Sequence, residues 1–218
     1  PVSAINTQIN FKGNSLETSH MAIRYGSTPL NIKGRIASLK NPEAELIVSS
    51  PDLNPADFGL APAEKPPRIQ QFSTSLGLRD GLLTIRNVSG KLPRTIFSAS
   101  GTVRTQGTPD INLRIAATHL DLEELLPLVA PSRTTEAGKK QQQPAPFRLQ
   151  ASVTAETGTF RGTGFTKLSA ALKNEEGILK LQKLTTGIFG GRLALNGQLA
   201  RTAGQAPKWD LSLLLEQA

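Results

Sequence analysis

The amino-acid sequence predicts a mainly β protein, in which repeated antiparallel strand units form a curved, elongated open sheet or groove with one or two short helices. Apolar and polar residues alternate with a period of two along most of the chain. Strand-sized segments also recur at fixed spacings, and only two short segments carry helix signals. An array of β-sandwiches is the alternative fold, because one-sided strands can also bury their apolar faces by closing two sheets on each other.

The alternating segments predict about eleven or twelve strands, each with one apolar and one polar face. Turn-forming residues between them predict turns at Asp80-Gly81, at Thr157-Gly158 and from Asn174 to Gly177. Residues predicted to share a face within a strand include Ala44, Leu46 and Val48; Phe72, Leu76 and Leu78; Ile111, Leu113 and Ile115; and Leu193, Leu195 and Leu199.

The chain also repeats itself without gaps. Residues 81–101 align with residues 177–197 at a constant offset of 96 residues, matching glycines with glycines and apolar residues with apolar residues. A second alignment, at an offset of 67, places Gly34, Leu46 and Leu53 on Gly101, Leu113 and Leu120. Repeated supersecondary units stack into elongated architectures that present one long binding surface, which favours a binding protein over an enzyme with a pocket.

Two short segments carry helix signals. Asp121 precedes a Leu-rich segment with Glu124 three positions later, the arrangement of a capping box, before Pro127 is expected to end the helix. Residues 54–57 are the counterpart in the earlier copy, with Pro55 at the first helical position. Each repeat is therefore expected to be a run of strands followed by one helical turn.

Composition divides the chain into three parts. Residues 1–128 contain the first repeating β units, and residues 147–218 contain the last one. Between them, residues 129–146 are rich in Ser, Thr, Lys, Gln and Pro. Such a segment cannot bury enough apolar surface to offset its ordering entropy, so we expect a flexible loop or linker there.

Overall composition excludes several function classes. The net charge of +8 comes from Lys and Arg spread along the chain, and aromatic residues make up only 5% of it, so no stacking platform for nucleic acid is expected. Cysteine is absent, which excludes disulfides and thiolate chemistry. No run approaches the ~20 apolar residues of a membrane span. The two ends of the sequence suggest a piece of a larger protein.

Catalytic and metal-binding groups are sparse. His20 and His119 are the two histidines of the chain, and the acids at Asp121 and Glu123 are better explained as helix-capping groups than as metal ligands. Glu175 and its acidic neighbour belong to a predicted hairpin turn, where adjacent carboxylates point apart. We therefore expect no enzymatic activity, no metal and no cofactor.

The last third of the chain resembles the C-terminal region of the AsmA family. The resemblance covers residues 147–215 and is carried by a Leu-rich strand and Gly-turn at 168–181 and by the Phe-Gly-Gly-x-Leu strand at 187–199. Residues 29–126 repeat the scheme more loosely, with Leu-Pro-Arg-Thr-Ile-Phe at 92–97 in place of the Gly-Gly element.

The resemblance implies a periplasm-facing protein of Gram-negative envelopes, anchored to the inner membrane by a transmembrane helix that this sequence does not include. AsmA-like proteins are similar to bridge-like lipid carriers and are associated with phospholipid movement and outer-membrane biogenesis. The implied ligand is a phospholipid or another acyl-chain lipid, envelope proteins are possible partners, and nucleic acid is not expected.

Strand periodicity assigns the lipid-facing residues within this scheme. They are Leu83, Ile85, Phe97, Ala99, Val103, Leu113, Ile115, Leu179, Leu181, Leu193, Leu195 and Leu199. In an open groove this face stays exposed and binds something apolar, whereas in a closed sandwich it is the core. The alternative function is a non-catalytic β scaffold or protein-interaction module of the envelope, and the sequence leaves both open.

Overall fold

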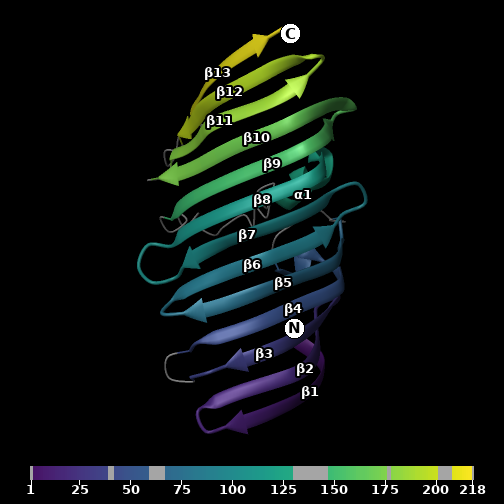
Figure 1. The fold of residues 1–218 in the computed structure, drawn as a ribbon, viewed down its shortest axis with the longest axis vertical. Helices are drawn as coiled ribbons and strands as arrows, with labels where there is room; N and C mark the ends of the chain where they lie inside the picture. Colours follow the sequence, from purple (N-terminus) through teal and green to yellow (C-terminus); the bar gives the residue numbers. More distant parts are fainter. Residues whose placement is uncertain are drawn as a thin grey trace, which may run out of the picture.

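In the residues that it describes, the computed structural model of the chain is a single open sheet of thirteen strands with two short helices (Figure 1). It describes residues 2–38, 42–58, 67–129, 147–175, 178–200 and 208–217. Strand order in the sheet follows the chain from β1 to β13, and in the described residues the two end strands are not paired with each other. The predicted mainly β, curved and open sheet is therefore confirmed, and these residues form no closed sandwich.

The strands are 9 to 13 residues long. All of them are longer than the usual five or six residues, which gives the sheet its width. In chain order they are β1 (Val2–Lys12), β2 (Ser15–Tyr25), β3 (Thr28–Ile36), β4 (Ala44–Leu53), β5 (Ile69–Arg79), β6 (Leu82–Lys91), β7 (Ile96–Arg104), β8 (Asp110–Asp121), β9 (Arg148–Phe160), β10 (Thr163–Glu175), β11 (Ile178–Ile188), β12 (Gly191–Ala200) and β13 (Lys208–Glu216).

Neighbouring strands are antiparallel with one exception, because β8 and β9 pair in parallel. The helix α1 (Leu122–Val129) follows the last residue of β8. β9 begins beside the first residue of β8, so it starts at the opposite end of that strand from α1. Of the predicted linker at 129–146, residues 130–146 lie outside the described residues.

Tight turns join many of the antiparallel strands. The predicted turn at Asp80-Gly81 is confirmed, and both residues have positive φ, as the mirror-image hairpin turns require. The predicted turn at Thr157-Gly158 is wrong, because both residues lie inside β9 and the chain turns after Phe160. Gly158 serves packing instead, since a Cβ there would meet the ring of Phe165 and a backbone carbonyl of β8.

Strand bounds extend the sequence repeat to three four-strand units. The units are β1–β4, β5–β8 and β10–β13, and β9 is an additional strand between the second and third. In each unit a glycine of the third strand faces a leucine of the fourth, and a Cβ on that glycine would clash with a carbonyl oxygen of the fourth strand. The three pairs are Gly34–Leu46, Gly101–Leu113 and Gly197–Leu211.

Both predicted helical segments are confirmed, as α1 and as the 3-10 helix η1 (Pro55–Phe58). Asp121 caps α1, since its Oδ1 accepts the backbone N–H of Glu123 at 2.9 Å. The predicted capping box does not form, because the Asp121 N–H donates to Thr95 and the Glu124 carboxylate accepts the backbone N–H of Arg94. The expectation that Pro127 ends the helix is wrong, because α1 continues to Val129.

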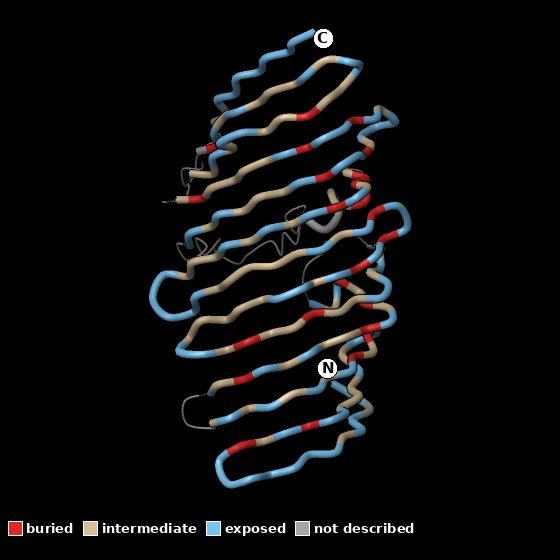
Figure 2. Tube along the Cα trace, viewed as in Figure 1, coloured by how far each residue is buried: buried red, intermediate tan, exposed pale blue. Residues whose placement is uncertain are grey.

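The buried hydrophobic cluster lies where α1 meets the sheet. Leu122 and Leu125 of α1 pack against a cluster that includes Leu120, Phe165 and Leu168. Many buried residues lie near the ends of the strands on the α1 side of the sheet, and residues in the middle of the strands are mostly of intermediate exposure (Figure 2). The core is therefore thin, as expected for a sheet of one layer.

Candidate functional site: an uncovered apolar face

The register of the sheet places one residue of every strand in a row across the molecule. Cross-strand partners lie on the same face, so the row can be followed from strand to strand. Its thirteen members are Phe11, Leu16, Ile36, Ala44, Leu78, Leu83, Val103, Ile111, Leu149, Asn174, Leu179, Leu199 and Trp209. All but Asn174 are apolar, so an apolar row crosses the sheet with one polar interruption.

A second row on the same face runs beside the first, and on each strand its member lies two residues from the member of the first row. It consists of Ile9, Thr18, Gly34, Leu46, Leu76, Ile85, Gly101, Leu113, Ala151, Leu172, Leu181, Gly197 and Leu211. Thr18 is the one member with a polar side chain. Together with the first row it makes a continuous apolar face, called here the apolar face.

All twelve residues predicted from periodicity to face a lipid lie on the apolar face. Leu83, Val103, Leu179 and Leu199 belong to the first row, and Ile85, Leu113 and Leu181 to the second. The other five, Phe97, Ala99, Ile115, Leu193 and Leu195, share strands and parity with these residues. Leu199 is buried, and the other eleven are of intermediate exposure.

Cover on the apolar face is local. The described residues form one sheet with no second layer of strands. α1 packs over its own end of β8 and β9, and the Phe58 ring of η1 packs on Tyr25 with ring centroids 5.2 Å apart. The partial burial of most apolar-face residues therefore comes from neighbours on the same curved face. Exposed apolar surface of large extent is typical of ligand-binding grooves and of membrane or protein interaction sites.

Three polar residues on the apolar face hydrogen-bond to the backbone, which the sequence pattern did not reveal, whereas the buried hydroxyls of Thr7 and Thr74 on the same face have no hydrogen-bond partner among the described residues. Asn174 is 7% exposed, and its Nδ2 donates to the carbonyl of Phe147 at 2.9 Å. Thr18 and Thr186 donate to the carbonyls of Gln8 and Thr166, at 2.9 and 3.0 Å. Both carbonyls lie at register shifts, where a bulge frees them from the ladder. These polar side chains therefore do not present a free hydrogen-bonding group to a ligand.

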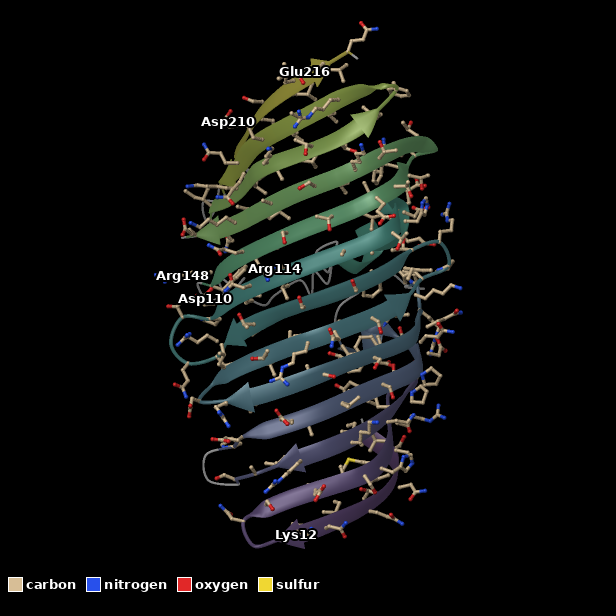
Figure 3. All side chains as sticks on the ribbon, in the orientation of Figure 1. Lys12, Asp110, Arg114, Arg148, Asp210 and Glu216 are labelled. Atoms are coloured by element: carbon tan, nitrogen blue, oxygen red, sulfur yellow. The ribbon has the colours of Figure 1, made fainter. Side chains whose placement is uncertain are left out.

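The opposite face is polar. The row that corresponds to the first apolar row reads Asn10, Glu17, Arg35, Glu45, Gly77, Thr84, Thr102, Asn112, Gln150, Lys173, Lys180, Gln198 and Asp210. Arg114 and Asp210, labelled in Figure 3, both belong to this face and are exposed. This row is polar or glycine on all thirteen strands, and the same face also carries the exposed apolar residues Ile47 and Leu214.

A shallow hollow of about 760 Å³ lies on the polar face, over β6 to β11. Its walls include the polar-face residues Arg86, Asn112, Arg114 and Gln150. Members of the second apolar row, such as Leu113, also border the hollow. Their side chains point to the apolar face, because both neighbours of each in its strand are polar-face residues. The backbone of these residues therefore forms the floor of the hollow. A guanidinium and amide lining suits water or polar groups rather than acyl chains. The hollow is therefore separate from the apolar face.

Ionisable groups form no reactive cluster in the described ranges. No group of three or more His, Asp and Glu residues there could hold a metal ion. His119 contacts the Thr157 hydroxyl at 3.1 Å. Glu175 lies at the end of β10, and its hydrogen bond with Lys173 at 2.8 Å lowers the pKa of its carboxyl. Its acidic neighbour at position 176 lies outside the described residues.

Two further observations concern the chain as a whole. In the described ranges, neither helix combines the length and apolar character needed to cross a bilayer. Comparison of the chain with family models, with curated proteins and with solved structures finds no match.

Proposed function

We propose that the chain is a periplasmic part of an AsmA-like envelope protein, anchored to the inner membrane in the full-length protein. Its apolar face would bind lipid acyl chains for intermembrane phospholipid transport and outer-membrane biogenesis. The observation that carries this proposal is the apolar face itself, which crosses thirteen strands and is covered in the described residues only beside α1 and η1.

The mechanism is partition of acyl chains between water and protein. Strands lie about 4.8 Å apart, so thirteen of them span roughly 60 Å. One leaflet of a bilayer is about 15 Å of hydrocarbon, so a single chain would cover only three or four strands. Each methylene removed from water contributes about 0.8 kcal/mol, wherever it lies along the face. A lipid can therefore move along the rows with little change in free energy.

The residues of the face suit this role because none of them does chemistry. Leucine, isoleucine and valine supply area, and Thr18, Thr186 and Asn174 donate to backbone carbonyls. The polar face leaves the other side of the sheet in water. We accordingly propose a carrier without catalytic residues, metal or cofactor.

The test is lipid retention by the chain purified from a bacterial periplasm, measured by native mass spectrometry and by displacement of an apolar dye. Leu195→Asp places a charge on the apolar face, midway along β12, the last strand but one of the sheet. Asn196→Asp is the matched control, since it adds the same charge one residue away on the polar face, where Asn196 is exposed. We expect fewer bound lipids for Leu195→Asp, because binding over the three or four strands around it weakens about tenfold, equivalent to about 1.4 kcal/mol, and no such loss for the control.

The outcomes separate the carrier from the scaffold. A folded wild-type chain that carries no lipid and binds no dye would contradict the carrier and favour the non-catalytic scaffold that contacts envelope proteins. Equal losses in both variants would mean that charge, rather than the apolar face, sets binding. Circular dichroism of each variant establishes that a loss of binding is not a loss of fold.

A further inference from the structure

The hollow on the polar face carries hydrogen-bonding groups that lipid binding does not use. Its walls hold the guanidinium groups of Arg86 and Arg114 and the side-chain amides of Asn112, Gln150 and Gln182. All five residues are exposed. None of the described residues that line the hollow is acidic. The hollow therefore offers two cations and several amides to a ligand with negatively charged groups.

The hollow forms because long and short side chains alternate along one row of the polar face. In the register of the sheet, Arg114 of β8 lies between Ser100 of β7 and Ser152 of β9, and Ser152 faces Ala171 of β10. Side chains of one or two heavy atoms leave space on both sides of a long arginine. The depression is therefore a product of this row of residues, and Arg114, labelled in Figure 3, lies within it.

A β-bulge places the second arginine beside the same depression. The register between β6 and β7 shifts after Ile85, and the bulge residues Arg86 and Asn87 both line the hollow. Asn87 has a φ of 52°, a left-handed conformation that asparagine tolerates better than most residues. Bulges often re-aim side chains in this way. Because only β7 lies between β6 and β8, the backbones at Arg86 and Arg114 are about 10 Å apart.

Both arginines are available to a ligand. Within the described parts of the chain, Arg114 has no salt bridge and no side-chain hydrogen bond. Arg86 lies near one carboxylate, with Nη1 3.7 Å from Glu45 Oε1, and the two side chains are 54% and 80% exposed. An ion pair so long and so exposed to water contributes little. A ligand therefore displaces no strong interaction when it pairs with either guanidinium.

The lining indicates the chemical class of the ligand. A guanidinium binds carboxylate or phosphate through two parallel hydrogen bonds. Amides both donate and accept hydrogen bonds, as the hydroxyl groups of a sugar do. No aromatic ring is among the described residues that line the hollow, so a nucleobase would find no surface to stack on. The lining thus favours a ligand that combines acidic groups with many hydroxyls.

We propose that this hollow binds an acidic oligosaccharide, a sugar chain that carries carboxylate or phosphate groups. Arg86 and Arg114 pair with the acidic groups, and the amides of Asn112 and Gln150 bind the hydroxyls. An open and shallow depression suits one stretch of a longer sugar chain. The inference goes beyond lipid binding and does not depend on it, because the polar and apolar faces lie on opposite sides of the sheet.

Calorimetric titration of the purified chain with four small probes tests the ligand class. Tetragalacturonate supplies carboxylates on a sugar chain, and phosphorylated pentamannose supplies phosphate. Maltotetraose is a neutral sugar of similar size, and tetraglutamate carries carboxylates without sugar hydroxyls. We expect at least one acidic sugar to bind about tenfold or more tightly than both controls, because only it engages guanidinium and amide groups together. Its affinity should fall as salt rises.

Two variants locate the binding, and a third is the matched control. Arg114→Gln should weaken binding of the acidic sugar about tenfold, since it removes the charge-assisted hydrogen bonds. Gln150→Met should weaken it about threefold and leave any weak binding of tetraglutamate unchanged, because it removes an amide but no charge. Arg35→Gln makes the same charge change as Arg114→Gln on an exposed polar-face residue of β3, about 24 Å away, and should have no effect.

Three results would overturn the proposal. Equal losses from Arg35→Gln and Arg114→Gln would assign binding to the charge of the whole face. Tetraglutamate that binds as tightly as the acidic sugars would point to an acidic peptide instead. Absence of binding by both acidic sugars up to about 1 mM would leave the hollow without this ligand. Circular dichroism checks the fold of each variant, and lipid retention is measured separately, so either proposal can fail alone.

Discussion

Two helical junctions of the molecule use the same hydrogen bonds. In the first, at the end of β4, the Asn54 N–H donates to the Thr28 hydroxyl at 3.0 Å, and the Ser27 N–H donates to the Asp57 carboxylate at 2.9 Å. The Ala56 N–H donates to the Asn54 side chain at 3.2 Å, which caps η1. Three backbone N–H groups are thereby satisfied where the strand ends and the helix begins.

The second junction, at the end of β8, repeats these bonds 67 residues later. The Asp121 N–H donates to the Thr95 hydroxyl at 2.9 Å, and the Arg94 N–H donates to the Glu124 carboxylate at 2.8 Å. The Glu123 N–H donates to the Asp121 carboxylate at 2.9 Å. The shared bonds therefore belong to the repeat and not to either helix alone.

The two junctions differ in burial and in the direction of the strand that comes after them. Asp57 is partly exposed, whereas Asp121 and Glu124 are buried and paired with Arg94, whose Nη1 lies 3.0 Å from Asp121 Oδ2. After η1 the next strand returns antiparallel, and after α1 the next strand runs parallel to β8. The hydrogen bonds end the fourth strand in both places, but the chain beyond them sets the direction of the next strand.

The largest difference is expected in the apolar contacts of the two junctions. Leu53 and Leu120 are equivalent positions, and Leu120 alone belongs to the cluster that Phe165 and α1 complete. Leu120→Ala should lower the free energy of unfolding by about 3 kcal/mol, because it leaves a cavity that a rigid helix and a ring cannot fill. Leu53→Ala should cost about 2 kcal/mol or less. Urea unfolding measures both, and equal costs would mean that α1 adds no packing.

The next effect concerns charge. Arg94→Met removes the cation beside two buried carboxylates, one of which has an oxygen, Glu124 Oε2, without a hydrogen-bond partner. We expect a loss of about 2 kcal/mol in the free energy of unfolding, measured in urea. This is below the roughly 3–5 kcal/mol of a fully buried pair, because the Arg94 side chain is 63% exposed.

The double variant Arg94→Met with Glu124→Gln is the control for this charge effect. It removes one carboxylate charge but keeps an acceptor for the backbone N–H of residue 94, so stability should largely return. Ser27→Met, at the equivalent place in the first junction, should cost less than Arg94→Met. If Glu124→Gln failed to restore stability, the loss would come from packing of the arginine stem rather than from its charge.

Periodicity in the sequence predicted the faces of the strands well, for a physical reason. A strand alternates its side chains whatever its neighbours are, so Leu83 and Ile85 could be placed on one face without knowing the sheet order. The parallel pairing of β8 and β9 could not be predicted in this way, because parity says nothing about the direction in which a later strand enters the sheet.

Errors arose where a residue served tertiary contacts rather than local ones. The Thr157-Gly158 pair has the composition of a turn, but Gly158 is small because Phe165 packs against it. Glu124 has the spacing of a capping box, but its carboxylate accepts a backbone N–H from the β6–β7 connection. In both cases the deciding partner is distant in sequence, so no local pattern contains it.

The smallest expected effect is a pH dependence confined to the first junction. The hydrogen bond from Thr28 is the largest cause that lowers the pKa of Asp57 below its usual value of 3.8, and bonds from Ser27 add to it. A carboxylate with a lowered pKa stabilises the fold above the unfolded-state pKa, and this contribution is lost as pH falls through the lowered value. The thermal midpoint of the wild type should therefore exceed that of Asp57→Asn at neutral pH, and the gap should close in acid below the usual value.

Thr28→Val tests the cause of this pH dependence. Without the Thr28 hydroxyl, the carboxylate loses its main reason for a lowered pKa. In the Thr28→Val background, the change in thermal midpoint caused by Asp57→Asn should therefore be smaller and vary less with pH. Thr95→Val is the matched change in the second junction and should leave the effect of Asp57→Asn as it is in the wild type. An effect of Asp57→Asn that is independent of pH in the wild-type background would show that Asp57 holds the junction as an acceptor only, with no contribution from its charge.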